Sequence, residues 1–72
     1  MTRKELFATI PNIITGYDGI TYFTDDQKWF DINVKGCIYP YEIDSLRKFC
    51  FVGSISFNLI NRCFEISCTD LD

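Results

Sequence analysis

Four cysteines are the side chains of this sequence with the most reactive chemistry: Cys37, Cys50, Cys63 and Cys68. A zinc site in a chain without histidine would need all four thiolates or additional carboxylates, and no C-x-x-C pair provides the spacing of a zinc knuckle. In a reducing cytosol, thiols of this kind usually serve as small buried hydrophobic side chains. We therefore expect packed free thiols, no metal and no cofactor. A disulfide and a metal site formed by the cysteines are the less favoured alternatives.

A thiol nucleophile is the only covalent chemistry that the residues suggest. Cys50 follows Arg47 and Lys48, and a nearby cation lowers the pKa of a thiol. However, the absence of histidine removes the commonest general base and both the Ser-His and Cys-His pairs. The sequence therefore favours a protein that is not an enzyme.

The acidic residues do not form an acid–base pair of the catalytic kind. Neighbouring carboxylates occur, for example, at Asp25 and Asp26 and at Glu42 and Asp44. Carboxylates acquire shifted pKa values through burial and specific partners, and adjacent acids in a turn are usually solvated. No glycine-rich phosphate-binding motif is present either.

Length and charge restrict the class of protein. The 72 residues suffice for one small domain, and the net charge of −3 gives a sequence pI near 4.7. An acidic surface repels phosphate, so direct nucleic-acid binding is disfavoured. No uncharged run approaches the ~20 apolar residues that span a bilayer. The first residues lack the apolar core of a signal peptide, so we expect a cytoplasmic protein without membrane contact.

An N-terminal helix is predicted from a capping motif and an apolar stripe. Thr2–Glu5 has the S/T-x-x-E pattern of a capping box. Leu6, Phe7 and Ile10 follow at helical spacing, and Pro11 is expected to end the helix at about Ile10.

A β-hairpin is predicted from two strands over residues 20–24 and 28–35, the second with strict alternation of apolar and polar residues. The loop length decides the register. A three-residue loop places Tyr22 on the apolar face of the second strand, and a two-residue loop places Phe23 there. In both registers Trp29 lies on the opposite face.

The middle of the chain contains a predicted strand, followed by a segment that can be interpreted as a helix or as a strand. Residues 37–39 are predicted as a strand closed by Pro40. A short helix over about 42–50 follows from apolar residues at helical spacing, with Gly53 as its C-terminal glycine. The aromatic and β-branched residues 48–52 are also typical of a strand.

A second hairpin is predicted near the end of the chain. Residues 54–59 alternate with Ile55, Phe57 and Leu59 facing inward, and 63–68 form the return strand, an expected sheet edge. Residues 69–72 have the composition of a frayed acidic tail. Ten isoleucines and seven phenylalanines against one alanine favour strands. We expect an α+β domain: one N-terminal helix on an antiparallel sheet of four to five strands, with a second short helix at about 42–50.

Aromatic residues are the strongest functional signal. They make up 17% of the chain, more than so small a domain can bury, and exposed aromatics with a charged rim are typical of protein-binding sites. The structural alternative is that Trp29 lies in the core or is covered by the helix. The predicted partner-binding residues are Trp29, Tyr22 and Phe23 with Asp25, Asp26 and Asp31, and a second group of Tyr39, Tyr41 and Glu42.

These features favour a small non-catalytic interaction module, an acidic inhibitor or adaptor of a protein with a basic, nucleic-acid-handling surface. In general character the chain resembles the orphan inhibitors that viruses of bacteria make against host defence nucleases, including anti-CRISPR proteins. No residue motif carries this resemblance. The alternatives are a small single-stranded nucleic-acid-binding domain that stacks bases on the aromatic hairpin, and a structural homodimer.

Overall fold

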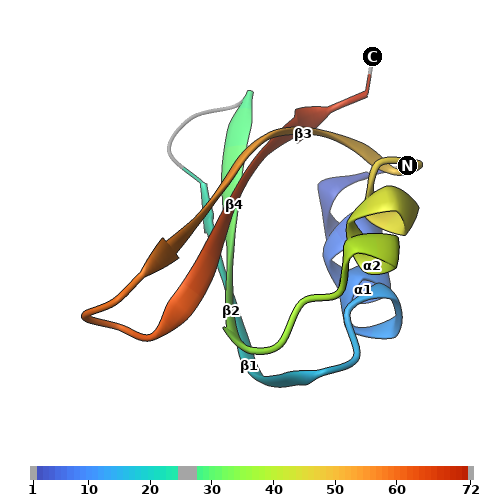
Figure 1. The fold of residues 1–72 in the computed structure, drawn as a ribbon. Helices are drawn as coiled ribbons and strands as arrows, with labels where there is room; N and C mark the ends of the chain where they lie inside the picture. Colours follow the sequence, from blue (N-terminus) through green and yellow to red (C-terminus); the bar gives the residue numbers. More distant parts are fainter. Residues whose placement is uncertain (1, 25–27, 72) are drawn as a thin grey trace.

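The computed structural model describes residues 2–24 and 28–71, which form two helices and four strands (Figure 1). The elements follow one another as α1 (Arg3–Ile13), β1 (Tyr17–Thr24), β2 (Trp29–Gly36), α2 (Pro40–Leu46), β3 (Cys50–Asn58) and β4 (Cys63–Asp70).

The strands form one antiparallel sheet in the order β1-β2-β4-β3. Both helices lie on the same side of this sheet (Figure 1). The α+β prediction is therefore confirmed, with four strands and the second helix. The strand predicted to be an edge, β4, is instead central, because it pairs with β2 on one side and β3 on the other.

Helix α1 begins with the predicted capping box. The Glu5 amide donates to the Thr2 hydroxyl (3.1 Å), and the Thr2 amide donates to the Glu5 carboxylate (2.9 Å). The predicted end at about Ile10 is wrong, because the helix continues through Pro11 to Ile13. Pro11 has no N–H to donate to the carbonyl of Phe7, four residues earlier. The hydroxyl of Tyr22 donates to that carbonyl instead (3.1 Å).

This replacement predicts a measurable coupling between Tyr22 and Pro11. Tyr22→Phe leaves the Phe7 carbonyl without its donor and is expected to reduce the free energy of unfolding by about 1 kcal/mol. Pro11→Ala restores an amide that can donate to the same carbonyl. Tyr22→Phe should therefore have a smaller effect in the Pro11→Ala background, as a double-mutant cycle by urea denaturation can measure. Equal effects of Tyr22→Phe in the two backgrounds would contradict this account.

The β1–β2 hairpin has the faces expected for the three-residue loop. Tyr22 lies opposite Ile32, and Thr24 lies opposite Phe30, so Tyr22 faces the helices. Its ring stacks on Phe7 with centroids 4.3 Å apart. Phe23 and Trp29 therefore point to the other side of the sheet.

The segment between β2 and β3 corrects two predictions. Residues 37–39 form no strand, and Pro40 does not close one; it starts α2. Proline is favoured in the first helical turn because that turn has no use for its missing N–H. The helix ends at Leu46, so Cys50 belongs to a strand, as the alternative interpretation of 48–52 proposed. Gly53 lies at an irregularity of strand β3 and caps no helix.

The last hairpin is confirmed, with two corrections. Ile55 and Phe57 share the helix-facing side with buried Ile66 but remain 41% and 46% exposed, because the hairpin extends away from the helices (Figure 1). Leu59 is 80% exposed as well. Thr69 and Asp70 are not a frayed tail; they end β4, and Asp70 forms an ion pair with Arg3 (2.8 Å).

The core fills the space between the helices and one sheet face. It contains eleven buried side chains: Leu6, Ile10, Ile14, Phe30, Ile32, Val34, Ile43, Leu46, Cys50, Ile66 and Cys68. All four cysteines are free thiols. Three are buried as predicted, whereas Cys37 is exposed.

Candidate functional site

The sheet face opposite the helices carries the candidate site, which we call the open face. Residues directly opposite on paired strands share a face, and Phe30, Ile32 and Cys68 point toward the helices. The alternate residues must then point away. The open face therefore carries side chains from all four strands. They are Thr21 and Phe23 of β1; Trp29, Asp31, Asn33 and Lys35 of β2; Phe51, Ser54 and Ser56 of β3; and Glu65, Ser67 and Thr69 of β4.

Three aromatic side chains gather at one end of the open face. Phe23, Trp29 and Phe51 are 49%, 42% and 58% exposed, and we call them the aromatic patch. Trp29 and Phe51 flank Thr69 in one cross-strand row, since each lies opposite it. Phe23 lies opposite Asp31 in the neighbouring row. Strands β1, β2 and β3 thus each contribute one aromatic residue.

The Trp29 ring reaches across the sheet to Gly53. A Cβ atom added to Gly53 would lie 3.0 Å from Cζ3 of Trp29, closer than ordinary packing allows. The absence of a side chain at Gly53 therefore leaves the space that the indole occupies. The ring is held against backbone on one side while 42% of the residue stays exposed.

Carboxylates lie among and beside these aromatic residues. Asp31 accepts a hydrogen bond from the Ser67 hydroxyl (2.8 Å), which orients its carboxylate on the open face. Glu65 lies on the same face opposite Asn33, and Lys35 follows along β2. The open face thus combines large apolar contact area with negative charge.

The open face is also hollowed next to the aromatic patch. A concavity of about 580 Å³ is lined by residues from β1 and β2 and by the turn between β3 and β4. Phe23 borders it on one side and Ile60, 92% exposed, on the other. An inserted side chain of a partner would meet apolar groups at both borders.

The structure brings together only part of the predicted partner-binding set. Trp29, Phe23 and Asp31 share the open face, whereas Tyr22 belongs to the covered face. Asp25 and Asp26 lie outside the described residues. The predicted helix over about 42–50 leaves Phe51 in no strand, so the sequence prediction missed this residue. The strand interpretation of 48–52 is the signal that could have identified it.

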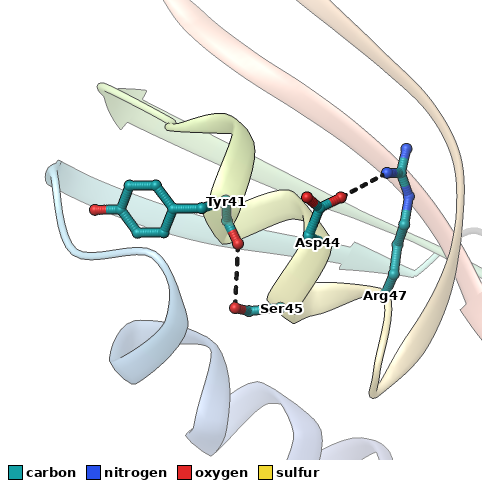
Figure 2. A network of polar contacts seen from close by, with 4 residues as sticks. All are labelled: Tyr41, Asp44, Ser45 and Arg47. Carbon is teal, nitrogen blue, oxygen red and sulfur yellow. Dashed lines mark hydrogen bonds and ion pairs between the residues drawn. The ribbon is translucent and has the colours of Figure 1, made fainter.

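The second predicted group lies at the start of α2, away from the aromatic patch. Tyr39 and Tyr41 are 45% and 64% exposed, with rings stacked at 5.7 Å between centroids. Figure 2 shows the Tyr41 ring directed away from the helix, while its carbonyl accepts from the Ser45 hydroxyl (3.1 Å). One turn further on, Arg47 and Asp44 form an exposed ion pair (3.1 Å).

Glu42, the third member of that group, is a buried anchor and offers no surface to a partner. It is 1% exposed. Its carboxylate accepts three hydrogen bonds: from the Thr15 amide (2.9 Å), the Thr15 hydroxyl (3.0 Å) and the Tyr39 amide (3.0 Å). Burial alone would raise its pKa, but these donors together outweigh burial, so the pKa of Glu42 lies below its ordinary value.

The two most deeply buried thiols, Cys50 and Cys68, interact with each other beneath the helices. The Cys50 thiol donates to the Leu46 carbonyl (3.7 Å), and the Cys68 thiol donates to the Ile66 carbonyl (3.9 Å). The interaction between the two thiols, with burial adding to the effect, raises the pKa of Cys68 above its ordinary value, and the same interaction lowers the pKa of Cys50. Both residues are 0% exposed. Both side chains therefore belong to the packed core.

Within residues 2–24 and 28–71 no group of three or more Cys, Asp or Glu side chains is placed to hold a metal ion. None of the helices in this part of the chain is long and apolar enough to cross a bilayer. Comparison of the chain with protein-family models, curated proteins and solved structures gave no match. The geometry of the open face is therefore the basis for a functional proposal.

Proposed function

We propose that this protein is a non-catalytic interaction module that binds a protein with a basic surface through its open face. The aromatic patch carries the proposal: three strands each present an aromatic residue, 42–58% exposed, on the side of the sheet that α1 and α2 leave uncovered. Tryptophan and other aromatic anchors contribute most of the binding energy in many protein interfaces.

The charge of the partner follows from the surroundings of the aromatic patch. Asp31 and Glu65 outnumber Lys35 on the open face, and the whole chain carries a net charge of −3. Complementary charge increases the association rate and selects the partner. A nucleic-acid-handling protein offers such a basic surface, which supports a role as a small inhibitor or adaptor of the kind that includes anti-CRISPR proteins. The lack of histidine and the burial of Cys50 and Cys68 support a non-catalytic role.

Variants of the open face test this proposal through quantitative mass spectrometry of proteins retained by the tagged chain. A basic protein retained by the wild type should be lost by about tenfold or more with Trp29→Ala and with Asp31→Lys. Tyr41→Ala removes an aromatic residue on the helical side that is more exposed than Trp29, and this variant should retain the partner. If all three variants retain the same proteins as the wild type, the open face is not the binding site.

Asp31→Lys also separates this proposal from single-stranded nucleic-acid binding. Stacking of bases on the aromatic patch would be strengthened by replacing a carboxylate with a cation. Binding of a labelled oligothymidine that increases with Asp31→Lys and disappears with Trp29→Ala would favour the nucleic-acid alternative. We expect no binding of this oligonucleotide by the wild type.

A further inference from the structure

We infer that the outer edge of β3 pairs with the same edge of a second copy of this chain, which joins two sheets into one of eight strands. In the described part of the chain β3 pairs only with β4, so its outer backbone amides and carbonyls have no strand partner. Such an edge is a template for another strand. This surface is separate from the aromatic patch and goes beyond the proposed function.

The residues of β3 do not protect this edge. Proteins usually block an edge strand with lysine, other charges or proline. From Cys50 to Asn61 the sequence contains no charged residue and no proline. The other edge strand, β1, carries Asp18 at an irregularity of its pairing. The unprotected edge is therefore β3.

The register of pairing follows from the irregularity at Gly53. Regular strand runs from Ser54 to Asn58, so an antiparallel pair of these segments has its two-fold axis at Ser56. In this register Ile55 of each copy lies opposite Phe57 of the other, and the two Ser56 residues face each other. Directly opposite side chains stabilise paired strands through apolar contact.

The apolar side chains left exposed on β3 match this arrangement. Ile55 and Phe57 are 41% and 46% exposed on the helix-facing side of the sheet. Phe57 already contacts the Phe64 ring edge to face at 4.9 Å. An apolar groove of about 360 Å³ between α2 and the sheet is lined by Ile55 and Phe64 and continues this surface. A second copy would cover the row with its own Ile55 and Phe57.

Electrostatics favour a second copy despite the net charge of −3. The facing segments are neutral, so no like charges meet in the new ladder. The carboxylate in the same cross-strand row is Glu65, opposite Ser56 on β4. The two Glu65 residues would be three strand spacings apart, roughly 14 Å, which exceeds the Debye length of about 8 Å at physiological salt. Their repulsion is therefore largely screened.

Light scattering across a concentration series of the full chain tests the inference. The wild type should reach twice the chain mass of 8.4 kDa. Ser56→Lys and Ser56→Glu each place like charges opposite one another at the two-fold axis, and each should raise the dimer dissociation constant by about fivefold or more. An equimolar mixture of the two variants places opposite charges there and should dimerise more tightly than either variant alone.

Thr21→Lys is the matched control, because it adds the same charge to an exposed residue of the other edge strand, and it should leave the dimer intact. Trp29→Ala should also remain dimeric, which separates this inference from the proposed function. A wild-type monomer at every concentration would overturn the inference. So would a dimer unaffected by both Ser56 variants, or a mixture that dimerises no better than its components.

Discussion

Glu42→Gln is expected to lower the free energy of unfolding by about 3 kcal/mol, measured by urea denaturation near neutral pH. The substitution preserves the shape of the side chain and removes its charge. The carboxylate accepts from two groups of Thr15 and from the Tyr39 amide in a buried setting. An amide nitrogen in place of one carboxylate oxygen would leave donors unsatisfied, and buried hydrogen bonds to charged groups are the costly ones to lose.

The loss should depend on pH in a definite direction. The pKa of Glu42 in the folded protein lies below its ordinary value of 4.5. Its stabilising contribution is therefore fully present above pH 4.5 and is lost as the pH falls through the lower, folded-state pKa. The difference in stability between wild type and Glu42→Gln should shrink over this acidic interval.

Asp44→Asn provides the control, because it removes the same charge from an exposed position of the same helix. Its effect should stay within about 0.5 kcal/mol. If the two substitutions cost the same amount, Glu42 does not act as the anchor of this region.

Gly36→Ala is expected to destabilise the domain by about 3 kcal/mol or more and to lower Tm by roughly 15 °C. Gly36 has φ +121°, a conformation that residues with a Cβ atom rarely adopt. An added Cβ would also collide with the Gly16 carbonyl oxygen and lie 2.9 Å from the Tyr17 Cα. Both neighbours are backbone atoms, so the start of β1 would have to move away from the end of β2.

Gly19→Ala is the matched comparison on the strand opposite. An added Cβ at Gly19 has no atom within 4 Å outside its chain neighbours, and its φ is ordinary. Thermal unfolding followed by circular dichroism should show little change for this variant. A Tm drop of similar size in both variants would mean that helix or strand propensity, and not the close approach at Gly36, controls the effect.

Local signals explain which parts of the fold could be predicted. The capping box at Thr2 and the alternation over 28–35 are complete within a few residues, and both predictions are confirmed. The continuation of α1 past Pro11 could not be predicted in this way. It depends on the hydroxyl of Tyr22, which comes from a different element. Likewise, a carboxylate such as Glu42 looks solvated in sequence until Thr15 and Tyr39 are brought to it.

The candidate site could likewise be predicted from the sequence only where the signal is local. Alternation along β2 was sufficient to place Trp29 on the face opposite Phe30. The helical spacing of apolar residues over 42–50 hides the strand that carries Phe51, although Phe51 completes the aromatic patch. The pairing of β2 with β4, which brings β1 and β3 into one sheet, joins strands distant in the sequence and has no local signature.

The strand order also determines how this chain can fold. Strands β1 and β2 form one local hairpin and β3 and β4 another, and the sheet joins them only through the pairing of β2 with β4. An isolated two-stranded hairpin is marginal in water. We therefore expect neither hairpin to be stable alone, and we expect the non-local β2–β4 pairing to be the slow step of folding. During synthesis, the four-stranded sheet can be completed only after β4 has left the ribosome, so we expect this domain to fold as one unit.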